Sequence, residues 1–293
     1  SIPMKETFGQ KTRRSHKRNQ RVVMFWCAFV FAFVIAGVWL FRGTLFQNDS
    51  GASSSGTNQS RHDACGTADS RQKSTDVTQA PMDHEVCQKL QDLVSQDQRV
   101  QQVIDNCEIY PEDILKMLSR NLDMLNFVLE YPEKVGQVFA ETVGEVEGGE
   151  VPLLLQYDQR WGYGDYGNSS VAVSGCGPAC LSMVITSLTG DDTITPYVVA
   201  QYASEQGYYV PGAGTAWTLM SEGAKHFGVI GEELPLTKSI MEGVLKEGRP
   251  IICSMRPGDF TTTGHFIVIT GIKDGQFTVN DPNSTERSNM LWD

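Results

Sequence analysis

Residues 174–184 read SGCGPACLSMV, and this stretch decides how the C-terminal half of the chain is interpreted. The apolar residues that follow position 178 predict a helix over 179–188. Pro178 suits the first turn of that helix, where a backbone N–H group has no partner to lose. Small residues surround Cys176, which is therefore predicted to lie at the N-terminus of the helix.

A cysteine in this place has the chemistry of a nucleophile. The positive end of the helix dipole and the free N–H groups of the first turn favour the thiolate form of Cys176. The same N–H groups can stabilise negative charge that develops on a substrate oxygen. Cys180 is the rival nucleophile, but it lies one turn inside the predicted helix, where no free N–H group is beside it.

The segments around and after this stretch predict an α+β fold. From apolar residues at helical spacing, helices are expected over 195–206, 217–227 and 238–246. Short apolar runs then predict strands over 250–255, 265–271 and 276–280, the last two joined by a turn at 273–275. The runs IICSM and HFIVIT are apolar at successive positions, which is typical of strands buried on both faces. Helices first and sheet last is the order of an α+β domain.

A general base and an orienting acid are expected at one edge of that sheet. His265 opens the second predicted strand, and Asp281 follows the third. If these strands pair as a hairpin, the two side chains can meet and the carboxylate can orient the imidazole. Each residue alone also has a structural explanation, His265 as a half-buried side chain and Asp281 as part of an Asp-Pro turn. His226 is the rival base, but it is interpreted as a surface or packing residue of the helix over 217–227.

Four segments of the C-terminal half resemble the C39-like peptidase family, which are cysteine peptidases with a papain-like fold. The segments are VPLLLQYDQRWG at 151–162, SGCGPACLSMV at 174–184, PGDFTTTGHFIVITGI at 257–272 and VNDPNS at 279–284. The resemblance implies a domain over 151–293 in which an N-terminal helix packs on an antiparallel sheet. It also implies that Cys176 is the nucleophile, His265 the base and Asp281 the orienting acid.

The resemblance further implies a glutamine that helps to stabilise the oxyanion. Papain-like enzymes place a Gln ahead of the Cys, and Gln156 is the candidate because it ends an apolar run where the family has its Gln. Gln159 is the alternative, and both lie farther from the Cys than in papain. Family members that trim bacteriocin leaders are fused to ATP-driven exporters, whereas this chain has no nucleotide-binding motif. Leader-peptide processing is therefore not implied.

The N-terminal part of the chain predicts a membrane anchor. Residues 22–41 read VVMFWCAFVFAFVIAGVWLF, which is uncharged and long enough to span a bilayer. Residues 1–21 carry a net charge of +6, so they are expected in the cytoplasm, with everything after Arg42 outside the cell. A signal peptide would have a shorter apolar stretch and a cleavage site of small residues. We therefore expect a single-pass protein of the cell membrane with an extracellular C-terminal domain.

Two further segments separate this anchor from the C-terminal domain. Residues 43–80 are rich in small and polar residues and predict a disordered stalk. Residues 82–143 show apolar residues at helical spacing and predict a small helical domain, which serves as a spacer or docks an unknown protein. Pro111 and Pro132 each follow a tyrosine and are expected to open new helical turns.

The cysteines outside the 174–184 stretch have structural explanations. Cys87 and Cys107 flank the first predicted helices, and a disulfide between them is a hypothesis that the sequence leaves open. Cys253 lies in an apolar strand and is interpreted as a buried structural thiol. Cys27 lies in the predicted span and Cys65 in the predicted stalk.

Composition limits the classes of partner. The chain has 24 Lys and Arg against 35 Asp and Glu, and residues after position 21 carry a net charge of −17, which argues against binding to nucleic acid. No metal cluster or phosphate-binding loop is seen in the sequence, so no cofactor is expected. Ser1 is an unusual first residue, and the chain stops soon after Asp281, so a truncated chain is also left open.

The sequence thus predicts a membrane-anchored extracellular cysteine peptidase that hydrolyses peptide bonds. Its substrate would be a peptide or the peptide stem of the cell wall. Two alternatives remain open at this point. One is a non-catalytic module that binds peptide or cell wall on the papain-like scaffold, because a fold can outlive its chemistry. The other is a wall amidase or acyl transferase with the same three residues, because hydrolysis and acyl transfer share a thioester intermediate.

Overall fold

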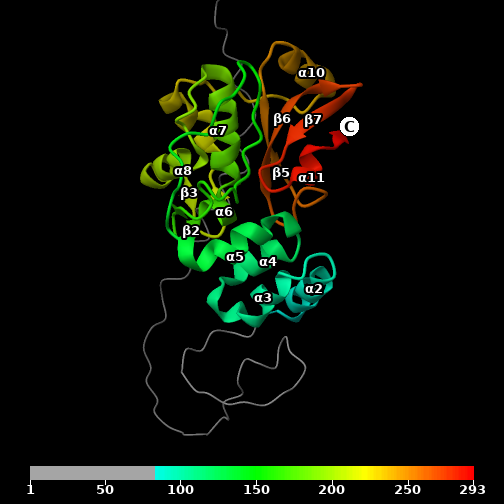
Figure 1. The fold of residues 1–293 in the computed structure, drawn as a ribbon. Coiled ribbons are helices and arrows are strands. Elements are labelled where there is room, and N and C mark those ends of the chain that lie inside the picture. Colours follow the sequence, from blue (N-terminus) through cyan, green and yellow to red (C-terminus); the bar gives the residue numbers. More distant parts are fainter. Residues whose placement is uncertain (1–82) are drawn as a thin grey trace, which may run out of the picture. The chain divides into compact units, whose positions relative to one another are not determined.

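A computed structural model of the chain describes residues 83–293 (Figure 1). The predicted cytoplasmic tail over 1–21, the predicted span over 22–41 and the predicted stalk over 43–80 lie outside these residues. Among the helices within residues 83–293, none has the length and the apolar composition that crossing a bilayer requires.

The first described part, residues 83–134, consists of short helices joined by tight turns. They are α2 (His84–Val94), α3 (Val100–Asp105), η2 (Cys107–Ile109), α4 (Glu112–Leu118), η3 (Leu122–Met124) and α5 (Leu125–Lys134). Side chains cap two of them, because Asp83 accepts the N–H of Glu85 and Asn121 accepts the N–H of Asp123. We call residues 83–134 the helical segment.

The two prolines of the helical segment have different places. Pro111 is the N-cap residue of α4, one position before the helix. The expectation that Pro132 opens a helix is wrong, because Pro132 lies inside α5, two residues before its end. Proline lacks the N–H that would bond the preceding turn, which fits the end of the helix at Lys134.

The hydrophobic core of the helical segment continues into the C-terminal part of the chain. The same cluster holds Phe127 and Val128 of α5 together with Tyr157, Tyr163 and Ala172. The rings of Phe127 and Tyr163 stack with their centroids 4.2 Å apart. The hydroxyl of Tyr163 donates to the carbonyl of Phe127 at 3.0 Å. The helical segment and the C-terminal part therefore share one buried cluster.

The C-terminal part combines helices with a four-stranded antiparallel sheet. Its helices are α6 (Val171–Ser174), α7 (Cys176–Thr189), α8 (Pro196–Glu205), α9 (Thr218–Ser221), η4 (Gly223–Phe227), α10 (Lys238–Lys246) and α11 (Thr285–Ser288). The sheet has the order β5 (Ile251–Met255), β6 (His265–Lys273), β7 (Gln276–Asn280) and β8 (Leu291–Trp292). Two small hairpins form separate two-stranded sheets. They are β1 (Asp165–Tyr166) with β2 (Ser169–Ser170), and β3 (Tyr209–Val210) with β4 (Gly214–Thr215). The mixture of helix and sheet agrees with the prediction of an α+β fold.

Strand β6 lies between two helices, which explains its continuous apolar run. Helix α7 covers one face of the sheet and α10 the other (Figure 1). Phe266 and Val268 pack in the cluster that contains α7, and Ile267 and Ile269 pack with α10. The prediction for the neighbouring run IICSM is wrong in part: only Ile251 of β5 is buried, because β5 is an edge strand.

Two local predictions can be compared with the structure. The hairpin between β6 and β7 turns through Asp274 and Gly275, both at positive φ, as a two-residue turn of this kind requires. The single helix expected over 217–227 is wrong, because the chain forms α9 and then the 3-10 helix η4. At the junction, a Cβ on Gly223 would lie 2.9 Å from the side-chain methyl Cδ1 of Leu219, so a larger residue there would require Leu219 to shift.

Candidate active site

Helix α7 begins at Cys176, so the helix starts three residues before position 179, where the sequence predicted its start. Gly175 is the N-cap residue and Pro178 is the third residue, inside the first turn. The first turn fits tightly against the hairpin of β3 and β4, since a Cβ on Gly177 would lie 2.7 Å from the side chain of Thr215. Cys176 is half-buried. Its backbone N–H and that of Gly177 belong to the group that has no acceptor within the helix.

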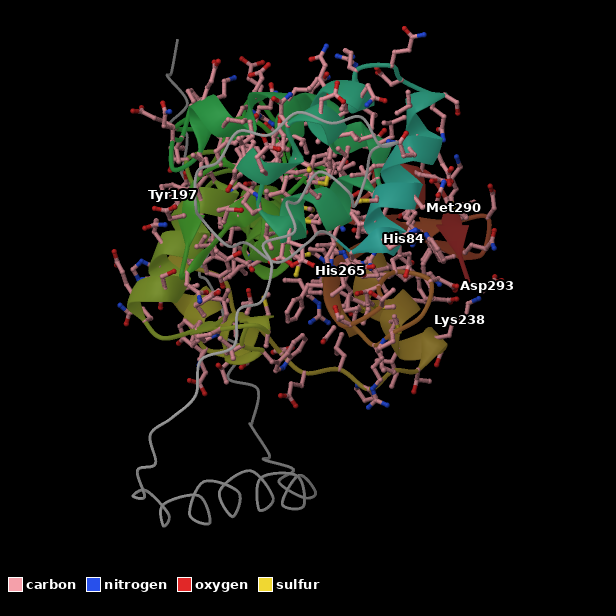
Figure 2. All side chains as sticks on the ribbon, turned by 90° about the horizontal axis from the view of Figure 1, so that it is seen from below. His84, Tyr197, Lys238, His265, Met290 and Asp293 are labelled. Atoms are coloured by element: carbon pink, nitrogen blue, oxygen red, sulfur yellow. The ribbon has the colours of Figure 1, made fainter. Side chains whose placement is uncertain are left out.

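The hairpin of β6 and β7 brings His265 and Asp281 together. His265 is the first residue of β6, and Asp281 directly follows β7. His265 Nε2 and Asp281 Oδ1 are 2.7 Å apart, and both side chains are buried. In the view from below in Figure 2, His265 projects between Tyr197 of α8 and Lys238, the first residue of α10.

The surroundings of His265 favour the protonated ring. Burial lowers its pKa, but the hydrogen bonds with Asp281 and with the Cys176 thiol outweigh burial and raise the pKa from 6.5 to about 9. Because Nε2 is the atom bonded to Asp281, Nδ1 is left as the nitrogen for the thiol. The structure therefore brings Cys176, His265 and Asp281 into one site, with the imidazole in the middle.

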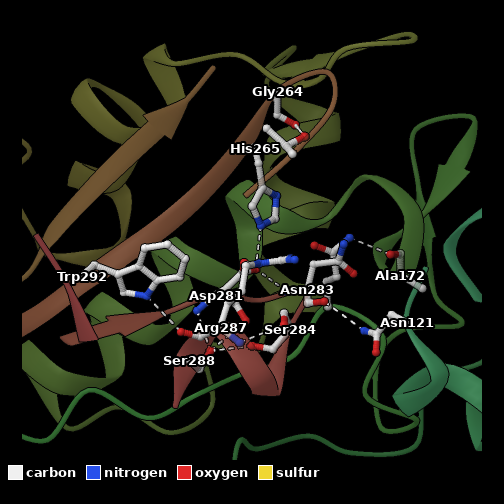
Figure 3. A network of polar contacts seen from close by, with 12 residues as sticks. Asn121, Ala172, Gly264, His265, Asp281, Asn283, Ser284, Arg287, Ser288 and Trp292 are labelled. Carbon is white, nitrogen blue, oxygen red and sulfur yellow. Dashed lines mark hydrogen bonds and ion pairs between the residues drawn. The ribbon is translucent and has the colours of Figure 1, made fainter. Parts of the chain in front are cut away.

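Asp281 has a second cationic partner that the sequence reasoning missed. Arg287 Nε donates to Asp281 Oδ2 at 2.6 Å, opposite the oxygen that faces His265 (Figure 3). The N–H of Asn283 donates to Asp281 Oδ1 at 2.7 Å. Burial raises the pKa of Asp281, but hydrogen bonding and charge from His265 and Arg287 outweigh it and hold the pKa below 3.8. Asp281 is thus a buried carboxylate with both oxygens bound.

Helix α11 holds Arg287 and the backbone of Asp281 in place. Ser284 caps this helix by accepting the N–H of Arg287 at 3.0 Å. Ser288 Oγ accepts the N–H of Asp281 at 2.9 Å, and the indole of Trp292 donates to the carbonyl of Arg287 at 3.1 Å (Figure 3). A serine cap followed by a basic residue in the last turn was the available sequence signal for this short helix.

The two glutamine candidates lie in different places. Gln156 is buried, and its backbone N–H donates to the carbonyl of Pro282 at 2.8 Å, next to Asp281. Its side-chain Nε2 donates to the carbonyl of Ala172 at 2.7 Å, and Oε1 has no hydrogen-bond partner. In this arrangement the amide group is bound to the backbone of α6. Gln159 instead donates to the carbonyl of Asn126 in α5, so Gln156 is the one beside the site.

The rival residues lie in less suitable surroundings. Cys180 is fully buried inside α7, and burial raises the pKa of its thiol well above the usual value. Burial likewise raises the pKa of Cys253 to about 11. His226 is exposed and stacks on Tyr202 with ring centroids 4.2 Å apart. Within residues 83–293, no group of three or more His, Cys, Asp or Glu side chains could hold a metal ion.

The family of the C-terminal part follows from its match to a family model. Residues 149–293 match the model of the peptidase C39-like family. This part of the chain belongs to that family. Neither the curated proteins nor the solved structures contain a match to the chain. All the residues of the site described above lie within the C39-like part.

Proposed function

We propose that the chain is a cysteine peptidase that hydrolyses peptide bonds with Cys176 as nucleophile and His265 as general acid and base. The observation that carries the proposal is the bond of 2.7 Å between His265 and the buried Asp281, at the end of the ring opposite Cys176. Membership of the C39-like family supports the reaction class. The buried carboxylate bound to the histidine beside a thiol favours the peptidase over a non-catalytic module.

In the first half of the proposed reaction, the thiolate of Cys176 attacks the carbonyl carbon of the scissile bond. The carbonyl electron pair moves to the oxygen, where the N–H groups of the first turn of α7 can donate to it. The intermediate then collapses and the C–N bond breaks. His265 gives its proton to the leaving amine, and a thioester remains on Cys176.

In the second half, water hydrolyses the thioester. His265, now neutral, takes a proton from the water as its oxygen adds to the thioester carbon. The C–S bond breaks, the carboxylic acid leaves, and Cys176 and His265 return as thiolate and imidazolium. Asp281 keeps the ring oriented through Nε2 and stabilises its positive charge in both halves. Gln156 serves the oxyanion through an N–H of its side-chain amide, whose nitrogen also donates to the carbonyl of Ala172.

Residues 22–41 anchor the enzyme in this proposal, with the C39-like part outside the cell. The support is the uncharged run of residues 22–41 and the charge contrast on its two sides. The substrate class is a peptide or the peptide stem of the cell wall. Digestion of intact cells with a protease tests the topology: removal of the C39-like part is expected. Its full protection until the cells are lysed would contradict it.

A peptide library tests the reaction. The full chain in detergent is incubated with the library in water enriched in ¹⁸O, and the products are identified by mass spectrometry. Cleaved peptides with ¹⁸O in the new carboxylate are expected from the wild type and not from Cys176→Ala. Products joined to an added amine, without ¹⁸O, would show acyl transfer instead. Equal cleavage by both proteins would overturn the assignment of Cys176.

A further inference from the structure

One turn of the helical segment contacts the loop that follows Asp281. Asn121 Nδ2 donates to the carbonyl of Asn283 at 3.0 Å, a partly buried contact visible in Figure 3. Two residues later, the carboxylate of Asp123 accepts the hydroxyl of Thr285. Both partners lie within four residues of Asp281 in the chain. The same turn therefore holds the loop at two successive points.

The turn also reaches the segment before His265. Arg120 lies 3.5 Å from the hydroxyl of Thr262, at the outer limit of a hydrogen bond. Thr262 precedes His265 by three residues. Residues 120–123 of the helical segment thus contact both the loop that follows Asp281 and the segment that precedes His265.

The apolar core of the helical segment supports the remaining parts of the site. Leu155 and Tyr157, on either side of Gln156, pack in that core. Ala172 and Val173 of α6, just before the N-cap of α7, pack there as well. Gln156 connects these two stretches, because its side chain donates to Ala172 and its backbone to Pro282.

We propose that the helical segment is a positioning element of the active site, and that Asn121 is the residue through which it holds the loop of Asp281. This inference rests on the proposed function, since it concerns the same site. It gives the helical segment a role other than that of a spacer. A shift of about 1 Å in a reacting group can cost about a hundredfold in rate, so a loop held from outside the site matters for the reaction.

The substitution Asn121→Ser separates this contact from the fold of the helical segment. Serine still caps η3, as Asn121 does now, but it is too short to reach the carbonyl of Asn283. Asn106→Ser is the matched control, because among the contacts described the side chain of Asn106 bonds only Gln102, which also belongs to the helical segment. Thr285→Val is a second variant, which removes the hydroxyl that Asp123 accepts and keeps the shape of the side chain.

Two measurements on the full chain test the proposal. The first is kcat and KM on a cleaved peptide: Asn121→Ser is expected to lower kcat about tenfold with KM changed less than about twofold. The second is the titration of His265 by NMR with ¹³C-labelled histidine, where a loosened Asp281 lowers the pKa of the ring. Thr285→Val is also expected to lower kcat and the pKa of His265, and Asn106→Ser is expected to change neither.

The two outcomes that overturn the inference differ from those that overturn the proposed function. If Asn121→Ser and Thr285→Val match Asn106→Ser in both measurements, the helical segment does not position the site, whatever the wild type cleaves. If the wild type cleaves no peptide, the proposed function fails, and the His265 titration alone decides the inference. A lower thermal midpoint with unchanged kcat and unchanged titration would show a structural contact only, which also overturns it.

Discussion

Arg287 and His265 bind opposite oxygens of one carboxylate. Arg287 Nε lies 2.6 Å from Asp281 Oδ2, and His265 Nε2 lies 2.7 Å from Oδ1. Asp281 itself has no solvent exposure. A carboxylate in such a place is stable only while it is paired and hydrogen-bonded. The arrangement therefore fixes which oxygen of Asp281 faces the imidazole.

Removal of Arg287 is expected to destabilise the protein. Arg287→Gln leaves a buried carboxylate with one cationic partner, which costs about 3 kcal/mol of unfolding free energy. Arg249→Gln is the matched control, because Arg249 makes exposed ion pairs with Glu232 and Glu247, and its loss is expected to cost less than about 1 kcal/mol. Denaturant unfolding measures both. Equal, small losses would show that Arg287 does not stabilise Asp281.

The pair of His265 and Asp281 is expected to stabilise the fold in a defined pH window. The pKa of His265 is raised from 6.5 to about 9, so its contribution is fully present below pH 6.5 and is lost as the pH rises through about 9. The pKa of Asp281 is lowered, so its contribution is present above pH 3.8 and is lost as the pH falls below that value. The window of full stabilisation is therefore about pH 4 to 6.5.

The measurement compares the wild type with His265→Asn by denaturant unfolding from pH 5 to pH 10. The advantage of the wild type is expected to shrink by about 3 kcal/mol across this range, on the alkaline side only. His226→Asn, at an exposed ring that stacks on Tyr202, corrects for the general loss of a histidine. An advantage that does not change with pH would mean that folding does not raise the pKa of His265.

Asp281→Asn separates the role of this residue in a turn from its role in the site. The amide oxygen of the substituted side chain could still accept the N–H of Asn283, so the turn should survive. With the amide oxygen at the Oδ1 position, which Asn283 and His265 share, the new NH₂ group faces Arg287 Nε, and both of these groups are donors. The negative charge that stabilises the protonated His265 is also lost. We expect kcat to fall about 10²- to 10⁴-fold while the domain stays folded.

The control for that change is Asp274→Asn. Asp274 lies in the two-residue turn between β6 and β7, where asparagine is equally suited to the positive φ of 53°. Its activity should equal that of the wild type. Wild-type activity in Asp281→Asn as well would remove Asp281 from the site and leave it as a turn residue.

The sequence predicted those parts of the site whose residues stand at the ends of regular elements. Cys176 starts α7 and His265 starts β6, and both positions follow from local apolar patterns and small neighbouring residues. Arg287 could not be found in this way, because α11 is a four-residue helix without an apolar period. Its contact with Asp281 depends on how the chain turns after β7.

The contacts between distant segments could not be predicted from the sequence either. Asn121 and Asn283 are 162 positions apart, and nothing in their local sequence distinguishes them from other turn residues. The residues of β5 were expected to be buried on both faces, since an edge strand and a central strand can carry the same apolar run. Which strand lies at the edge is decided by the sheet as a whole.

The three described cysteines of the C39-like part are expected to differ in reactivity. Cys176 is half-buried at a helix terminus beside His265, whereas burial raises the thiol pKa of Cys180 and Cys253. Iodoacetamide at neutral pH should therefore alkylate Cys176 first, because the thiolate is the reactive form. Peptide mapping by mass spectrometry measures the order. Faster alkylation of Cys180 in the folded protein would contradict the assignment of the nucleophile.

The most direct test of the central claim is the rate of peptide cleavage by the full chain and by its Cys176→Ala, His265→Ala and double variants. Nucleophile and base act as one unit, so each single variant is expected to abolish turnover and the double variant to be little worse than either. Cys253→Ala, which removes a half-buried thiol from β5, serves as the control and should retain the wild-type rate. A wild-type rate in His265→Ala would contradict the proposed cysteine peptidase mechanism.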